Sequence, residues 1–388
     1  MSAINFDAIT EQLYKAKDVV VAEPIGITTS VTLNIGADGV SKGATVKSVS
    51  TPTLTVNESD DESMTLPSGD AATLGVEEMT LAYTANVKIE LGGNDWAKIT
   101  NVGSGDSTMA DLMQQAIRGI RNKIETTAAG VIYKYASRSV GTSGTTPFAS
   151  NWNVLNSLRQ VLEDNGITLD DGQCSCVFNT AAATNLRNLA QLQKANEAGN
   201  DTLLRKGTLL DLSGFMLKSS AGIGSHTKGA GTGYDIVSAG EAIGQTVLTL
   251  EGGTVNTTGI KAGDVITIDT DTAHAYVVNT GLTATGGDIT IGSPGLRVAG
   301  VNASELTVVE SYTPNLAFHR SAVEIAMRPP AMPPGGDAGT HIATIVDAKS
   351  GIVVDVVMYY GKRVNVLNFT THYGVKVWKQ AGVASLRG

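Results

Sequence analysis

The longest helical pattern of the chain is residues 109–138, MADLMQQAIRGIRNKIETTAAGVIYKYASR. Thr108 with Asp111 fits a capping box at its start. At 1.5 Å per residue this helix would be ~45 Å long, which is too long for the core of a small domain. We therefore expect a spine against which other elements pack. Its apolar residues recur at spacings of three and four and form one stripe: Met113, Ile117, Ile120, Ile124, Ala128, Val131 and Tyr135.

Before this helix the sequence predicts a long hairpin-like excursion. Residues 27–56 and 79–91 alternate as strands do, and the polar, acidic stretch NESDDESMTLPSGD (57–70) lies between them. Two extended arms cannot bury both faces alone, so we expect the excursion to lie on a neighbour. The tip of the excursion carries four acidic residues, Glu58, Asp60, Asp61 and Glu62. Their clustered oxygens could bind a divalent cation, but we favour a solvated loop or a salt-bridging surface.

After the spine the pattern is mixed. Helices are predicted over 151–166 and from Asn179, with a strand between them that carries two cysteines, Cys174 and Cys176. We expect these thiols to be buried and not to pair with each other. Residues 207–219 read as a strand pair, and a Gly-rich loop follows.

The composition then changes. Residues 236–310 hold 13 Thr and 12 Gly, and their eight acidic and two basic residues give a net charge of −6. Short alternating stretches between turn residues predict a small all-β module, a barrel or a sandwich. Mixed material lies on both sides of it, so we interpret the module as an insertion. The last part predicts a short helix over 317–327 and two long strands within 351–378.

Composition and charge limit the function. The chain has 388 residues, of which 42% are hydrophobic, so global disorder is excluded. A net charge of −9 argues against a dedicated nucleic-acid binder, but it is compatible with a container that encloses nucleic acid. No apolar run is long enough for a transmembrane helix, and the N-terminus shows no secretory pattern.

No active site is evident. The Walker A, HExxH, GxSxG and paired CxxC motifs are absent from the sequence. Five histidines are dispersed without an i, i+4 pair, so we expect no metal and no cofactor. Cys174 fits a buried small hydrophobe better than a nucleophile, and His319 fits capping or packing. Away from the apolar stripe of the spine lie three basic residues that either face nucleic acid or a partner's acids, or are simply solvated: Arg118, Arg121 and Lys123.

Two C-terminal segments carry a family resemblance. Residues 315–333, NLAFHRSAVEIAMRPPAMP, and residues 347–388 resemble the closing segment of the P22-type coat proteins, which are major capsid proteins of tailed bacteriophages with the HK97-like fold. The shared features are the Asn-Leu-Ala-Phe-His-Arg start, the strands around Tyr359–Gly361, and the late Tyr-Gly-Val-Lys-Val. Upstream, residues 207–220 look like the family's strand before its inserted domain, and residues 16–26 are also similar.

The resemblance implies an α+β, HK97-like capsid fold with an inserted small all-β domain. It implies these divisions: an N-terminal arm (1–45), an E-loop with flanking strands (46–91), a peripheral domain with the spine helix (92–150), a first part of the axial domain (151–235), an inserted β-barrel-like domain (236–310), and axial and peripheral return strands (311–388). In this family the E-loop lies over the adjacent subunit.

The implied function is structural and non-enzymatic. The chain would form pentamers and hexamers of an icosahedral phage head that encloses double-stranded DNA without sequence-specific binding, with no membrane involved. The implied partners are further copies of the chain, a scaffolding protein, a portal and a decoration protein, with assembly in the bacterial cytoplasm. Glu58, Asp60, Asp61 and Glu62 would then contact a neighbouring subunit. Arg118, Arg121 and Lys123 would form an inward basic face.

Two other classes remain open from the residues alone. The Thr- and Gly-rich module suggests a β-rich surface binding module or adhesin, which should be monomeric and exported. An uncharacterised hydrolase would need a compact pocket with a base beside a Ser or Cys.

Overall fold

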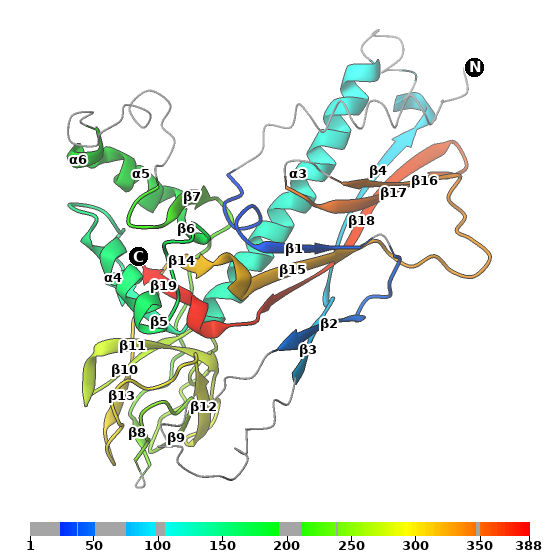
Figure 1. Cartoon of the computed structure of the whole chain (residues 1–388). Helices are drawn as coiled ribbons and strands as arrows, with labels where there is room; N and C mark the ends of the chain where they lie inside the picture. The colour runs from blue at the N-terminus through cyan, green and yellow to red at the C-terminus, as the bar shows by residue number, and fades with distance from the viewer. Residues whose placement is uncertain are drawn as a thin grey trace, which may run out of the picture.

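The computed structural model describes residues 24–36, 38–50, 75–95, 97, 105–193, 211–237, 240–346 and 350–388. The helix predicted within residues 1–23 and the acidic stretch 57–70 lie outside the described residues. The fold is mixed helix and sheet, with two large sheets, a two-stranded ribbon and one long helix (Figure 1). In the part of the chain that is described, no helix is long and apolar enough to cross a membrane.

The long helix α3 spans Gly105–Ile132, so it begins and ends earlier than predicted. Thr108 therefore lies inside the helix, and the predicted capping box is wrong. Residues Tyr133–Tyr135 form a single 3₁₀ turn, η1, because the chain must become extended at Arg138 to pair in β5. The predicted stripe is confirmed from Met113 to Ala128, whereas Val131, also within the helix, is only half-buried. The buried residues of the stripe are Met113, Ile117, Ile120, Ile124 and Ala128.

A six-stranded sheet lies against α3. Strand β18 is its centre: β15 and β17 pair with successive parts of one side of it, and β4 pairs along the other. Apolar residues of α3, β4, β15, β17 and β18 form one core cluster. The strands are β1 (Thr32–Ile35), β4 (Tyr83–Gly92), β15 (Val323–Arg328), β16 (His341–Val346), β17 (Val353–Tyr360) and β18 (Val364–Val377).

A second layer is built from five strands and three helices. Its strand order is β5-β19-β14-β6-β7, and a separate core cluster fills the space between these strands and α4 and α5. The helix predicted over 151–166 is α4, and Gly166 follows it with a positive φ of 79°. The helix predicted from Asn179 begins as α5, where the Asn179 side chain accepts a hydrogen bond from Ala182 N. The elements are β5 (Arg138–Gly141), β6 (Cys174–Asn179), β7 (Met216–Ser220), β14 (Pro314–His319), β19 (Val383–Arg387), α4 (Asn153–Asp164), α5 (Thr180–Asn188) and α6 (Ala190–Gln193).

Six antiparallel strands between Tyr234 and Val308 close into a barrel. The order is β10-β13-β8-β9-β12-β11, and β10 also pairs with β11, which completes the ring around a core cluster of its own. The chain enters after His226 and leaves before Tyr312, and these two residues pair through His226 N to Tyr312 O at 2.7 Å. The strands are β8 (Tyr234–Ile236), β9 (Val247–Glu251), β10 (Val265–Ile268), β11 (Asp271–Thr280), β12 (Gly287–Ile291) and β13 (Glu305–Val308).

The helix predicted over 317–327 is wrong. This stretch is the end of β14, a 3₁₀ turn (η2, Arg320–Ala322), and then β15. Strand β14 lies between β19 and β6 and all but one of its residues are buried, so it lacks the alternation by which a strand is recognised. Tertiary pairing outweighs the moderate helix preference of Ala, Glu and Met here.

Candidate functional site

A two-stranded ribbon extends from the body and forms what we call the arm. Strands β2 (Thr45–Ser50) and β3 (Gly75–Thr80) pair antiparallel over their full length and stand apart from both large sheets (Figure 1). Lys47 and Glu78 lie directly opposite each other and form an ion pair at 3.2 Å. Val76 is 59% exposed on this ribbon. The arm therefore offers backbone edges and an exposed apolar side chain, Val76, for contact with another surface.

The base of the arm is fixed to the body. Met79 and Leu81 are buried together with Ala326 of β15. Lys376 of β18 contacts Glu77 at 3.1 Å, and its ammonium lies 4.3 Å from the centre of the Trp378 ring. These contacts hold the direction in which the arm leaves the sheet.

A groove of about 1350 Å³ runs beside this base. Its walls come from β3, the end of α3 with η1, the end of β18, and one loop of the barrel at Ser293. Two lysines in it, Lys134 and Lys379, form no ion pair with any carboxylate of the described residues. Arm, spine and barrel therefore meet at this groove, and no carboxylate of the described residues pairs with its two lysines.

A buried carboxylate on α3, that of Glu125, binds two neighbouring segments of the chain to the helix. Glu125 is 1% exposed and accepts four hydrogen bonds. The donors are Ile27 N (2.8 Å), Thr28 N (2.9 Å), Thr28 Oγ1 (2.6 Å) and Ser220 Oγ (2.7 Å). One side chain thus joins the spine helix to the segment before β1 and to the end of β7.

The predicted site residues are only partly placed. Glu58, Asp60, Asp61 and Glu62 lie outside the described residues. Arg121 is 2% exposed, Arg118 is half-buried and Lys123 is exposed, so these three do not share one open face of α3. An inward basic role stays a prediction for Arg118 and Lys123, whereas Arg121 is enclosed within its own chain.

A buried histidine lies where the barrel meets the spine. His226 Nε2 is 2.7 Å from Asp264 Oδ1, and His226 Nδ1 is 3.0 Å from the hydroxyl of Tyr133 at the end of the spine. Tyr312 donates to the carbonyl oxygen of Gly263 at 2.8 Å. Burial raises the pKa of Tyr312 above its ordinary value. These contacts join the barrel to the helix through polar groups that are satisfied by one another.

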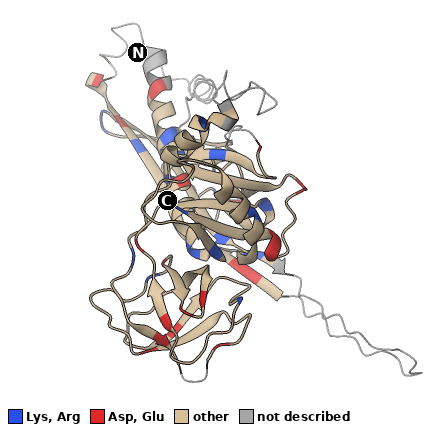
Figure 2. Ribbon diagram, turned by 90° about the vertical axis from the view of Figure 1, so that its left-hand side faces the viewer, with Lys and Arg blue, Asp and Glu red and all other residues tan. Residues whose placement is uncertain are grey.

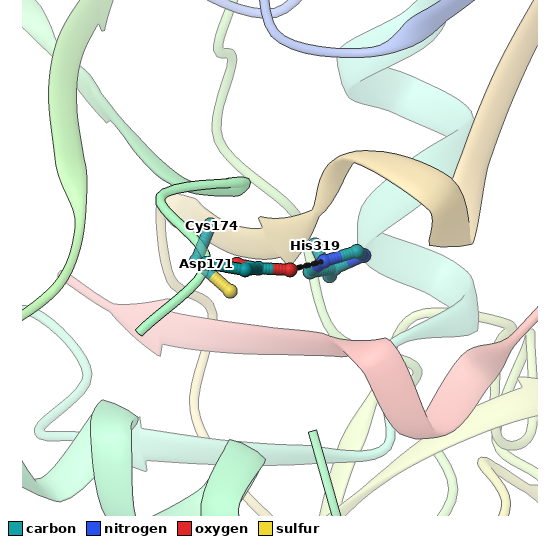
Figure 3. A group of neighbouring side chains, drawn as sticks. All are labelled: Asp171, Cys174 and His319. Atoms are coloured by element: carbon teal, nitrogen blue, oxygen red, sulfur yellow. Dashed lines mark hydrogen bonds and ion pairs between the residues drawn. The ribbon is translucent and has the colours of Figure 1, made fainter. Parts of the chain in front are cut away.

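Asp171 and Cys174 lie beside His319, which is distant from them in sequence (Figure 3). His319 Nε2 is 2.8 Å from Asp171 Oδ2, while the thiol of Cys174 donates to Thr168 O at 3.7 Å. Burial raises the pKa of the Cys174 thiol to about 12, so the nucleophilic thiolate is disfavoured. The dispersed histidines had led us to expect no metal ligands, yet one of them meets two further donor groups here. Sequence spacing offered one signal, the Asp-x-x-Cys turn at 171–174.

The solved structures that the chain resembles include phage capsids. One is from Mycobacterium phage Che8 (13% identity, 89% of this chain and 85% of that chain covered, TM-score 0.43). Another is the capsid structure of cyanophage P-SCSP1u (11%, 94% and 88%, 0.45), and a third is the mature capsid of bacteriophage PhiM1 (11%, 93% and 86%, 0.44). No protein-family model and no curated protein matches the sequence. Likeness at this level of identity and TM-score carries no argument about function, which has to come from the chain itself.

Proposed function

We propose that the chain is a major capsid protein that assembles with copies of itself into the pentamers and hexamers of an icosahedral tailed-phage head. The observation that carries this proposal is the arm. A two-stranded ribbon is marginal by itself in water, and the β2–β3 ribbon leaves Val76 exposed, so it needs a neighbour's surface. A chain that stabilises its neighbours with a projecting arm is suited to repeated, self-complementary contacts.

The remaining architecture supports the same role. In the HK97-like assignment, the arm is the E-loop and α3 is the spine of the peripheral domain. The layer of strands β5, β19, β14, β6 and β7 with helices α4 and α5 is the axial domain, and the barrel is the inserted domain. The spine is backed by a sheet and fixed by Glu125, which makes the body rigid enough to transmit contacts between its ends. We keep the domain limits expected from the sequence, 236–310 for the inserted domain, although the first strand of the barrel begins two residues earlier, at Tyr234.

Charge distribution supports enclosure of DNA without sequence readout. The barrel segment 236–310 carries a net charge of −6, and Figure 2 shows acidic residues on its strands. Like charge keeps this part away from phosphates, so we place it on the side of the shell that faces away from DNA. A scaffolding protein, a portal and a decoration protein are the further partners, and assembly takes place in the bacterial cytoplasm. No catalytic role is proposed.

Electron microscopy of the purified chain tests the proposal. The chain is imaged alone and with its candidate scaffolding protein, beside a variant in which residues 51–74 are replaced by Asn-Gly, a two-residue turn that joins β2 directly to β3. We expect shells or sheets of hexamers and pentamers for the full chain, and folded but unassembled protein for the variant. Uniform particles of about 40 kDa from the full chain under both conditions would refute the capsid role.

The acidic stretch 57–70, which joins β2 to β3 in the sequence, and the groove suggest a specific contact. We propose that Asp60 and Asp61 of one copy pair with Lys134 and Lys379 in the groove of the next, because those lysines lack a carboxylate partner among the described residues. Reversal of either pair (Asp60→Lys with Asp61→Lys, or Lys134→Glu with Lys379→Glu) should lower particle yield. The two reversals combined should restore it. Unchanged yield for both single-sided reversals would contradict this contact while leaving the capsid role untouched.

A further inference from the structure

Three metal-binding side chains converge where β6 begins and β14 ends. Cys174 and His319 are direct partners in the antiparallel register of these strands, so their side chains project from adjacent positions of one sheet face. Asp171 precedes Cys174 by three residues in a turn through Gly172, whose φ is +67°. The donor atoms of the three residues lie within 4.8 Å of one another (Figure 3).

The donor set suits zinc. A thiolate sulfur, an imidazole nitrogen and a carboxylate oxygen are the three ligand types that Zn²⁺ takes in proteins, and three protein ligands leave a fourth tetrahedral position for water. Zinc bonds of ~2.0–2.3 Å place such donors ~3.5 Å apart. His319 Nε2 and Asp171 Oδ2, now 2.8 Å apart, would separate by a fraction of an ångström to admit the ion.

Neighbouring groups orient the ligands. His319 Nδ1 lies 2.7 Å from Ser321 Oγ and accepts a hydrogen bond from Ser321 N at 3.2 Å, which holds the ring with Nε2 toward Asp171. Binding of Zn²⁺ at Nε2 leaves the ring proton on Nδ1, which then donates to Ser321 Oγ in place of accepting from Ser321 N. The other oxygen of Asp171 accepts from Gln173 N at 2.9 Å, which directs Oδ2 toward His319. The nearby guanidinium of Arg159 pairs instead with Glu163 at 2.7 Å and with Asp170 at 3.5 Å.

The side chains of Cys174, His319 and Asp171 differ in how far they are exposed to solvent. Cys174 is buried, the His319 side chain is 17% exposed, and the Asp171 side chain is 39% exposed. An ion can therefore enter from the carboxylate side, reach the sulfur, and keep a water ligand toward solvent. Two of the three residues, Cys174 and His319, lie on paired strands, which hold their side chains more firmly than loops do.

We propose that Asp171, Cys174 and His319 form a zinc-binding site. Zn²⁺ is bound by Asp171 Oδ2, Cys174 Sγ and His319 Nε2, and the proton of the thiol is released to solvent. The bound ion fastens the turn before β6 to the end of β14 and to η2. This inference does not depend on the proposed capsid role, because it concerns contacts within one chain.

Titration of the purified full chain with Zn²⁺ alone and with Co²⁺ alone tests the site. Calorimetry should give one Zn²⁺ per chain, and Co²⁺ should give the near-ultraviolet absorption of a cobalt–thiolate bond. Cys174→Ser should abolish that absorption and weaken Zn²⁺ binding at least ~100-fold. Cys176→Ser is the matched control, since it changes a buried thiol two residues away in the same strand and should leave both readouts unchanged.

A second variant guards against misfolding. His319→Asn keeps a polar group at the surface end of the site and should also weaken Zn²⁺ binding ~100-fold while the far-ultraviolet circular dichroism stays that of the parent. No cobalt–thiolate absorption from the parent chain, or the same absorption from the folded Cys174→Ser variant, would overturn the proposal.

Discussion

Glu125→Gln should loosen the attachment of the N-terminal segment to the spine helix. The native carboxylate accepts two donors on each oxygen: Ile27 N and Ser220 Oγ on Oε1, and both the amide and the hydroxyl of Thr28 on Oε2. The glutamine amide keeps one acceptor oxygen, but its NH₂ group then faces two donors. The Thr28 or Ile27 amide consequently loses its partner inside the protein.

The magnitude follows from this count. A buried donor left without a partner costs about 1–3 kcal/mol, and the bonds that remain lose the strengthening that a charged acceptor provides. We expect a loss of about 2–4 kcal/mol in the free energy of unfolding. Asp111→Asn, an exposed change on the same helix, should stay within about 0.5 kcal/mol of the parent.

Two assays on the unassembled chain read this effect. Urea unfolding gives the change in stability from the shift of the midpoint, and amide hydrogen exchange reports Ile27 and Thr28 individually. One of these two amides should exchange faster in Glu125→Gln, whereas neither should change in Asp111→Asn. Unaltered protection of both amides together with a midpoint equal to that of the control would refute the reasoning.

Three further predictions concern the body of the chain. Burial raises the pKa of Asp355, so the folded state holds this proton more tightly than the unfolded chain and loses stability as pH rises through the raised pKa. The advantage of Asp355→Asn in urea midpoint should therefore grow from pH 4 to pH 7, and a constant advantage would contradict the titration. Gly130→Ala should raise stability by about 0.5–1 kcal/mol, because no atom lies within 4 Å of the added carbon, whereas Gly374→Ala places that carbon 2.5 Å from a backbone oxygen at the end of β3 and should lower it. Thermal melts that rank these two in the opposite order would count against the packing. Since burial raises the pKa of Cys174 to about 12 and that of Cys176 well above its ordinary value, iodoacetamide at pH 8 should label the thiols only after unfolding, and native labelling seen by mass spectrometry would disprove this.

The local sequence pattern was sufficient to predict the helices and strands that bury only one face. The stripe from Met113 to Ala128 predicted the spine, and two shorter helices were predicted over 151–166 and from Asn179, where α4 and α5 lie. The alternating strands of the Thr- and Gly-rich segment were predicted for the same reason. Each of these signals depends on neighbours within about one helical turn or one strand.

Elements determined by distant partners were missed. Residues 317–327 became strands because β14 is enclosed by β19 and β6, whose residues are remote in sequence. Strand β16 went unpredicted because its sequence, HIATIV, does not alternate although its burial does: apolar Ile342 and Val346 lie on its exposed side. The meeting of His319 with Asp171 and Cys174 depends on the register of β6 with β14, which no spacing along the chain reveals.

The pairing of His226 with Tyr312 brings together the two ends of the segment that forms the barrel. These residues are hydrogen-bonded to each other in both directions, so removal of residues 227–311 would leave ends placed like those of a hairpin, which a two-residue turn joins. Removal would also expose the edge of β5, which pairs with β11, and the end of the spine, where Val265 and Val277 pack. The barrel is in this sense a unit that can be taken out at one point of the chain, at the cost of these two contacts.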